Sequence, residues 1–189
     1  AKLNIDTCAP EEACPLGLAP TTSTTSSLAL GDAIAIALLE ARGFNSNDFA
    51  KSHPGGKLGK RLLLKVSNLM HTGKDFPCVR SDSKLSETLL EVSSKGLGIA
   101  VVIDSSNKMK GVFTDGDLRR ALNKKIDIHA TRISQLMSKK AKTIKEDELA
   151  INALDIMQSN AIYSLVVFDS KNYPIGIIRM HDLIESGLI

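Results

Sequence analysis

The sequence repeats one stretch at a spacing of about 65 residues, and this repeat constrains the fold more than any other feature. Residues 111–118 read GVFTDGDL and follow an apolar run that ends with VVID at residues 101–104. The related copy reads VVFD at residues 166–169 and GIIRMHDL at residues 176–183. Self-similarity at a long fixed period indicates one duplicated supersecondary unit that packs against its copy. We therefore treat the chain as a tandem repeat preceded by a different N-terminal segment.

Composition bounds the size of the core and the class of partner. The chain has 189 residues, 43% of them hydrophobic, which suffices for one ordinary core or two small ones. Its 24 basic and 21 acidic residues nearly balance, 4% of residues are aromatic and tryptophan is absent. Stacking platforms for bases need aromatic side chains, so we expect no nucleic-acid partner. Two short basic stretches are interpreted as solvated surface: Lys57, Lys60, Arg61 and Lys65, and Lys139, Lys140, Lys142 and Lys145.

Cysteine and histidine usage argues against a disulfide framework and a metal site. The three cysteines, Cys8, Cys14 and Cys78, are odd in number and show no C-x-x-C spacing. This pattern favours a reducing compartment. His71, His129 and His181 lie in separate segments of the repeat and form no metal triad by spacing. We expect no metal.

From the apolar pattern of the sequence we expect neither a membrane anchor nor a leader. The longest apolar stretch, Leu28–Leu39, is interrupted by Gly31 and Asp32, and a bilayer needs roughly 20 residues. No basic segment followed by an apolar one opens the chain. We expect a cytoplasmic protein with no membrane partner. The first residue is Ala1, and residues 1–6 read as the middle of a domain, so we also expect a fragment or a processed product.

Before the repeat, the sequence predicts one long helix. The hydroxyl run Thr21–Ser27 is good material for capping a helix, and Leu28–Arg42 is then apolar on nearly every face. Such a helix must be buried on most sides, against its own domain or against another subunit. We expect Gly43 to be the C-cap of this helix.

Within each copy, the pattern predicts the element order β-α-β-β-α. Short strands at Cys78–Val79 and Thr143–Ile144 are followed by an amphipathic helix. Two continuous apolar runs come next, as expected of strands that are buried on both faces. A second helix closes each copy, from about Asp115 and from about His181. The predicted apolar strands are residues 99–103 and 111–113 in the first copy, and residues 164–168 and 175–178 in the second.

This order, with the pattern G-h-h-[ST]-x-x-D at the last strand–helix junction, resembles the CBS domain, two of which pack into a Bateman module. The resemblance covers roughly residues 64–189. It implies an α/β (α+β) fold with one CBS domain at residues 64–126 and another at residues 127–189, after an N-terminal segment of residues 1–63.

The resemblance also implies a ligand cleft. In that family the hydroxyl residue and the aspartate of the pattern flank a cleft for a nucleotide-type ligand, and a helix N-terminus there offers N–H donors. Thr114 and Asp117 match the pattern in the first copy. In the second copy Asp182 is retained, but Arg179 replaces the hydroxyl residue.

Two alternatives stay open from the residues alone. Arg179 can meet a phosphate, fill the cleft or face solvent. Asp117 and Asp182 can serve only as helix caps, in which case the pair would be a dimerisation platform without a ligand.

The N-terminal segment carries a second resemblance. Residues 12–25 read EACPLGLAPTTSTT and residues 49–59 read FAKSHPGGKLG, both ahead of the repeat. This order resembles the bacterial D-arabinose 5-phosphate isomerase family, which joins a sugar isomerase (SIS) domain to two CBS domains. The resemblance covers essentially the whole chain and implies that residues 1–63 are the C-terminal, mainly helical remainder of the SIS domain. It implies interconversion of D-ribulose 5-phosphate and D-arabinose 5-phosphate for the synthesis of Kdo, an acid sugar of lipopolysaccharide. It also implies a sugar-phosphate substrate, a tetramer, no cofactor for catalysis, and a regulatory nucleotide or CMP-Kdo in the CBS cleft.

The isomerase resemblance assigns two catalytic candidates. Isomerisation through an enediol needs a general base and a group that moves hydroxyl protons. By the resemblance, Glu12 is the base and His53 the histidine that opens the ring or shuttles protons. From the residues alone, Glu12 is more often a first-turn or surface carboxylate, and His53, before Pro-Gly-Gly, is more often a structural turn residue. The sheet that carries the sugar-phosphate loop would lie before Ala1, so we expect this chain alone to be inactive. Its alternative function is then a nucleotide- or CMP-sugar-sensing module.

Overall fold

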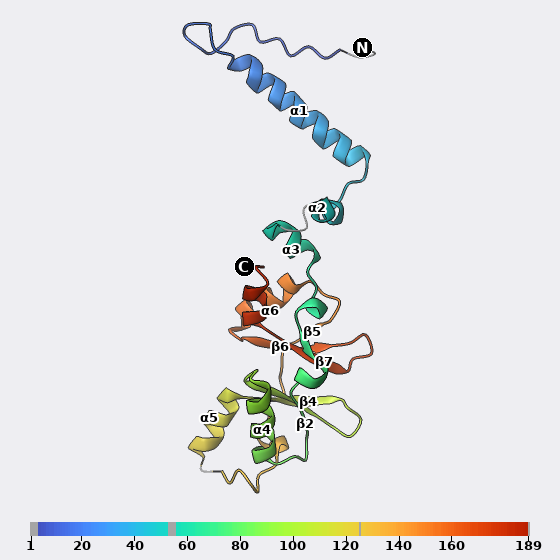
Figure 1. Cartoon of the computed structure of the whole chain (residues 1–189), viewed down its shortest axis with the longest axis vertical. Helices are drawn as coiled ribbons and strands as arrows, with labels where there is room; N and C mark the ends of the chain where they lie inside the picture. Colours follow the sequence, from blue (N-terminus) through green and yellow to red (C-terminus); the bar gives the residue numbers. More distant parts are fainter. Residues whose placement is uncertain (1–3, 53–55, 125, 189) are drawn as a thin grey trace. The chain divides into compact units, whose positions relative to one another are not determined.

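The computed structural model describes residues 4–52, 56–124 and 126–188 (Figure 1). It divides the chain into an N-terminal unit, residues 1–49, and a C-terminal unit, residues 50–189. Each unit is described by itself.

The N-terminal unit contains one long helix, α1, which spans Thr22–Ala41. The predicted start at Leu28 is wrong, because the hydroxyl run forms the first turns of the helix instead of preceding it. The hydroxyls of Thr24 and Thr25 both donate hydrogen bonds to the carbonyl of Thr21, so both side chains are satisfied within the first turn of the helix. The predicted end is confirmed: Gly43 has a φ of +62°, and its N–H bonds to the carbonyl of Glu40.

None of the α1 residues is buried in the described structure, although the helix is apolar on nearly every face. By length and composition alone, α1 could cross a membrane, and it is the one described helix of which this holds. A core helix of a soluble protein passes the same test. The expectation that α1 is covered on most sides is not met by the described residues.

The C-terminal unit contains the two repeats, and the predicted order β-α-β-β-α is confirmed in each. A short helix, α2 (Ser46–Ser52), spans the boundary of the units, and α3 (Lys57–Leu63) precedes the first repeat. The first repeat comprises β2 (Cys78–Arg80), α4 (Leu85–Lys95), β3 (Ile99–Ile103), β4 (Met109–Thr114) and α5 (Asp115–Asn123). The second comprises β5 (Thr143–Lys145), α6 (Ala150–Asn160), β6 (Ser164–Phe168), β7 (Pro174–Arg179) and α7 (Met180–Glu185).

Each repeat forms one lobe around its own sheet (Figure 1). The first lobe has the strand order β2-β3-β4, and the second has β1-β7-β6-β5, in which β1 is the short strand His71–Thr72. β2 runs parallel to β3, and β5 runs parallel to β6, whereas the pairs β3/β4 and β6/β7 are antiparallel. The central strands are almost wholly buried, as their continuous apolar runs predict.

The segment that opens each repeat crosses to the other lobe. The two-residue strand β1 (His71–Thr72) pairs with β7 of the second repeat, and Ser138 forms the related bridge with Val112 of the first. Side chains follow the same exchange, because Val66 lies in the core of the second lobe and Ile133 in the core of the first. The lobes therefore cannot separate without breaking both strand contacts. The predicted domain boundaries at residues 63/64 and 126/127 stay a prediction.

Two glycines make this exchange possible. A Cβ atom on Gly111 would lie 2.5 Å from the carbonyl oxygen of Ser138. On Gly176 it would lie 2.7 Å from the carbonyl oxygen of His71. Both distances are too short for a real contact, so the crossing strands need glycine at these positions. A third apolar cluster, which includes Val101, Val112, Val166 and Ile177 from both sheets, joins the lobes.

Candidate functional site

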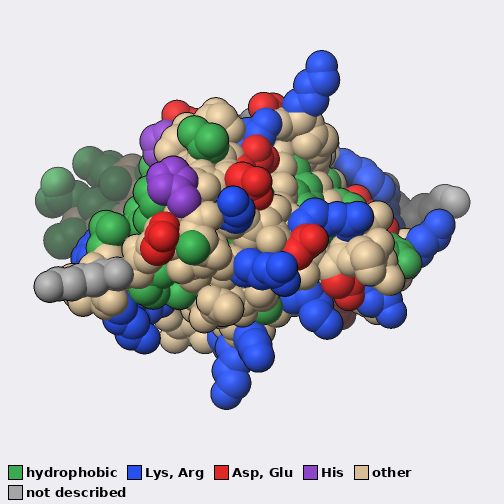
Figure 2. All heavy atoms as spheres, turned by 90° about the horizontal axis from the view of Figure 1, so that it is seen from below, with side chains coloured by type: hydrophobic (Ala, Val, Ile, Leu, Met, Phe, Trp, Pro, Cys, Tyr) green, Lys and Arg blue, Asp and Glu red, His purple; other side chains and the backbone are tan. Residues whose placement is uncertain are grey.

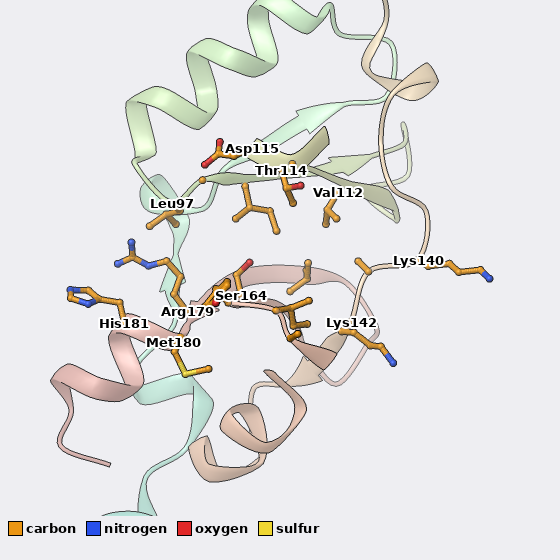
Figure 3. A pocket seen from close by; sticks show the side chains of 18 of the residues that line it. Leu97, Val112, Thr114, Asp115, Lys140, Lys142, Ser164, Arg179, Met180 and His181 are labelled. Carbon is orange, nitrogen blue, oxygen red and sulfur yellow. The ribbon is translucent and has the colours of Figure 1, made fainter. Parts of the chain in front are cut away.

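A cleft of about 800 Å³ lies between the two lobes of the C-terminal unit (Figure 3). Its size falls in the range of clefts that hold one small-molecule ligand. The repeats contribute related segments: residues 97–99 and 112–116 from the first, and residues 162–166 and 179–181 from the second. The second repeat alone adds residues 140–142. Of the predicted site residues, Thr114 and Arg179 line the cleft, whereas Asp117 and Asp182 do not.

Asp117 is held in the first lobe by hydroxyl groups and one arginine. It is 5% exposed, and one carboxylate oxygen accepts hydrogen bonds from the Thr114 N–H and hydroxyl at 2.9 and 2.7 Å. The other oxygen accepts from Ser138 Oγ at 2.8 Å and Arg120 Nη2 at 2.5 Å. Thr114 is also the N-cap of α5. Its hydroxyl is therefore engaged with Asp117 at the edge of the cleft.

Asp182 is held in the second lobe by a histidine and an arginine. It is 8% exposed, and one oxygen accepts from the Arg179 N–H at 2.8 Å. The other lies 2.9 Å from Arg179 Nη2 and 3.0 Å from His71 Nε2. His71 comes from the crossing strand β1, just as Ser138 comes from the crossing segment of the other lobe. In both clusters the aspartate accepts from the N-cap backbone and from a side chain of the crossing segment. The clusters differ in which side chains donate to the aspartate.

The electrostatics of both aspartates favour the charged form. Burial raises the pKa of each carboxyl, but the hydrogen bonds to Asp117 from Thr114, Ser138 and Arg120 outweigh it. For Asp182, the bonds from Arg179 and His71 do the same, so both pKa values lie below the ordinary aspartate range. Every carboxylate oxygen already has at least two donors. Neither aspartate can hold a ligand hydroxyl without releasing a partner.

Sequence reasoning did not single out several residues that line the cleft. Lys140 and Lys142 were assigned to a solvated surface, and both are exposed, but they line one end of the cleft. In Figure 3 they lie away from Arg179 and His181. His181 also bonds to Glu185 at 3.0 Å. Lys140 and Lys142 lie three residues and one residue before β5, and this position indicates the cleft, because the repeat register brings the start of each parallel strand to the domain interface.

The cleft suits an anionic ligand with an apolar part. Its cations are Lys140, Lys142 and Arg179, and Asp115 is the one carboxylate among the residues that line it. Most of the remaining lining is apolar, including Ile99, Val112, Ala141, Ile162 and Val166. On the face drawn in Figure 2, by contrast, basic and acidic side chains of the described residues are interspersed.

Glu12 lies in the N-terminal unit and caps α1. Its carboxylate accepts hydrogen bonds from the Thr21 N–H at 2.7 Å, the Thr21 hydroxyl at 3.0 Å, the Ser23 N–H at 3.4 Å and the Ser23 hydroxyl. Thr21 itself makes no capping bond with its side chain, so the predicted capping by the hydroxyl run is wrong in this respect. The Ser23 hydroxyl, followed by the Thr21 N–H, lowers the pKa of Glu12 to about 2.

The second catalytic candidate, His53, lies outside the described residues. Among the residues that are described, no group of three histidine, cysteine or acidic side chains is placed to hold a metal ion.

Comparison with known proteins places this geometry in a family. The family described as "CBS domain" matches residues 66–124 and 133–188, which together make up more than half of the chain. The chain belongs to the CBS domain family. Each match covers one repeat, so the α/β fold class and the tandem CBS pair that the sequence predicted are confirmed.

Curated relatives match the chain beyond its CBS pair. The arabinose 5-phosphate isomerase KdsD of Pseudomonas aeruginosa is 52% identical over 189 residues, which are 100% of this chain and 58% of that protein. The KdsD protein of Yersinia pestis is 48% identical over 180 residues, 95% of this chain and 55% of that protein. The chain thus spans a little over half the length of these relatives.

Among solved structures, a CBS domain protein from Pyrobaculum aerophilum, PAE2072, superposes with a TM-score of 0.59. It is 17% identical and covers 66% of this chain and 98% of its own, and it was solved in complex with AMP. At this identity the likeness supports the CBS fold alone.

Proposed function

We propose that this chain is the C-terminal part of an arabinose 5-phosphate isomerase that interconverts D-ribulose 5-phosphate and D-arabinose 5-phosphate for Kdo and lipopolysaccharide synthesis. The observation that carries the proposal is the 52% identity to the Pseudomonas aeruginosa isomerase across all 189 residues. The match includes the 65 residues ahead of the first CBS match, which starts at residue 66. A shared CBS pair alone would not extend the likeness into that segment.

In this proposal, Glu12 is the base that moves the proton between C1 and C2, and His53 moves protons between the sugar oxygens. A base works best when its pKa lies near the working pH. The Ser23 hydroxyl and the Thr21 N–H hold the pKa of the half-buried Glu12 at about 2. Burial by the rest of the intact enzyme raises the pKa of a carboxyl. Glu12 would therefore become an effective base only in the complete site.

The test is an aldose–ketose assay of the intact polypeptide. Glu12→Gln and His53→Ala should each lower kcat by roughly 100-fold or more, the usual contribution of general acid–base catalysis. Glu11→Gln is the matched control, because Glu11 is the exposed neighbour of Glu12, and it should keep parental activity. Full activity in both test variants would remove the catalytic assignment.

The second function that we propose, regulatory ligand binding, is supported by the cleft between the CBS domains. Its cationic and apolar lining fits a nucleotide or a CMP-sugar such as CMP-Kdo. A ligand at 100 times its Kd stabilises a protein by about 2.7 kcal/mol. For a chain of this size that raises Tm by roughly 5 °C or more. No shift of the 189-residue chain with AMP, ATP or CMP-Kdo would favour an assembly role for the CBS pair.

We also propose that the intact protein is a cytoplasmic tetramer. The support is α1, whose apolar side chains include Leu28 at 67% and Ile36 at 57% exposure. Contact with other parts of an assembly would bury these side chains. Light scattering on the intact protein measures the oligomeric state, and a monomer would contradict this proposal.

A further inference from the structure

The register of the two sheets identifies related positions at the domain interface. Cys78 pairs with Val101, and Thr143 pairs with Val166 at the same place in the other sheet. The preceding carbonyls are equivalent too, because Pro77 accepts from the Val101 N–H and Lys142 from the Val166 N–H. Residues 75–77 of the first repeat are therefore the counterparts of residues 140–142 of the second.

These counterparts differ in size. Ala141 packs at the edge of the cluster that joins the lobes and lines the open cleft. Its counterpart, Phe76, packs against the same cluster with a whole aromatic ring and does not line the cleft. The methyl group of Ala141 leaves space open in the cleft, whereas the ring of Phe76 fills the related space in the first repeat. Lys142 likewise is exposed, whereas its counterpart Pro77 is buried.

The counterparts also differ in charge. Lys140 and Lys142 border the open end of the cleft, and the related positions carry Asp75 and Pro77. An anion is attracted to two ammonium groups and repelled by a carboxylate. Size and charge thus act in the same direction, since the 140–142 side accepts an anion and the 75–77 side excludes one.

The strand–helix junctions show the same difference in charge between the two repeats. Arg179 presents a guanidinium to the cleft, whereas its counterpart Thr114 presents a hydroxyl that is already bonded to Asp117. Arg179 uses Nε and Nη2 on Asp182, and its Nη1 bonds to none of the described residues. Two cationic segments of the second repeat therefore face the cleft, and neither has a cationic counterpart in the first.

We infer that the cleft holds one anionic ligand of mononucleotide size per chain, and that the pair Ala141 and Phe76 sets this single occupancy. The ligand lies on the second-repeat side, between residues 140–142 and Arg179. The related position of the first repeat is closed by Phe76 and by the charge of Asp75. This inference rests on the proposed nucleotide binding and adds its stoichiometry and its determinants.

Isothermal titration calorimetry of the 189-residue chain with AMP, and in parallel with ATP, tests the inference. The expected result is a stoichiometry of about one ligand per chain. Ala141→Phe copies the closed position into the open one and should weaken binding by at least about 30-fold, as expected for an overpacked site. Lys142→Glu changes only an exposed side chain and should weaken binding about 10-fold.

The matched control is the double variant Asp75→Lys, Phe76→Ala, which alters the counterpart positions and leaves the cleft lining intact. Its first binding event should keep the parental affinity within about twofold, and a second, weaker event would support the inference further. Thermal melting of each variant without ligand separates loss of binding from loss of folding, and the exposed Lys142 keeps the test valid if Ala141→Phe does not fold.

Each outcome decides a different claim. Two ligands per parental chain would overturn the single occupancy, and unchanged binding by Ala141→Phe and Lys142→Glu would overturn its determinants; in either case nucleotide binding stands. No heat with either nucleotide would overturn this inference together with the proposed binding of adenine nucleotides. The isomerase proposal is decided separately, by the activity of the intact polypeptide.

Discussion

In the first repeat the buried Asp117 is held by two hydroxyls and by Arg120, whose side chain is 66% exposed. In the second, Asp182 is held by His71 and Arg179, which are 30% and 24% exposed. The backbone plan is the same, since the aspartate caps its helix and a crossing segment supplies one donor. The difference is that the second repeat uses half-buried cationic or titratable partners. It therefore depends on its carboxylate more strongly than the first.

The largest expected effect is on stability when each carboxylate is removed. Asp182→Ala leaves Arg179 and His71 without their partner in a half-buried setting, and should lower the free energy of unfolding by about 3 kcal/mol. Asp117→Ala should lower the free energy of unfolding by about 2 kcal/mol. The loss is smaller because the exposed Arg120 becomes hydrated, so that only the hydroxyls of Thr114 and Ser138 lose a buried partner. Urea unfolding of the 189-residue chain measures both. An equal or smaller loss for Asp182→Ala would show that the partners do not distinguish the repeats.

Acid titration sharpens the same comparison. Both aspartates have a lowered folded pKa, so the unfolded chain binds their protons at higher pH than the folded chain. Their contribution is present above the ordinary aspartate pKa of about 3.9 and is lost as the pH falls through the lowered value. Asp117→Asn and Asp182→Asn should each remove part of the stability loss between pH 5 and pH 3. If either variant lost stability with falling pH as steeply as the parent, protonation of that carboxylate would not be linked to folding.

The next largest effect is expected at the glycines under the crossing segments. Gly111→Ala and Gly176→Ala should each lower the free energy of unfolding by about 2 kcal/mol, because the new Cβ atom meets backbone that cannot turn away. Gly111→Ala should cost slightly more, since its contact of 2.5 Å is shorter than the 2.7 Å at Gly176. Gly116→Ala is the control, because its Cβ atom would meet no atom closer than 3.6 Å. A loss at Gly116 as large as at the other two would contradict the steric explanation.

The elements of the repeat could be predicted because each is encoded locally. Continuous apolar runs at residues 99–103 and 164–168 predicted β3 and β6 with the bounds that the structure has. The crossing of β1 to β7 could not be predicted, because two residues carry no periodicity and their pairing is fixed by a glycine more than 100 positions away.

The candidate site was predictable only in part, for a related reason. The family pattern identified Thr114 and Arg179, which line the cleft, together with Asp117 and Asp182, which do not. A pattern gives spacing along the chain and does not show that a carboxylate is already saturated by donors. The start of α1 was misplaced because its cap, Glu12, lies nine positions before Thr21 and no local rule connects them.

The smallest expected effect is at the ends of α4 and α6, where the repeats place different residues in the same backbone conformation. Gly96 has a φ of +67° and Ala161 a φ of +51°, both in the left-handed region. A residue with a Cβ atom is disfavoured there by roughly 1–2 kcal/mol relative to glycine. Glycine offsets part of this advantage, because it raises the conformational entropy of the unfolded chain. Ala161→Gly should therefore stabilise the chain by about 1 kcal/mol, and Gly96→Ala should destabilise it by a similar amount. No atom lies within 4 Å of a Cβ on Gly96, so backbone strain alone is tested. Thermal melting compares the two variants. If both moved Tm in the same direction, packing around α6 would outweigh the backbone term, and the equivalence of the two helix ends would fail.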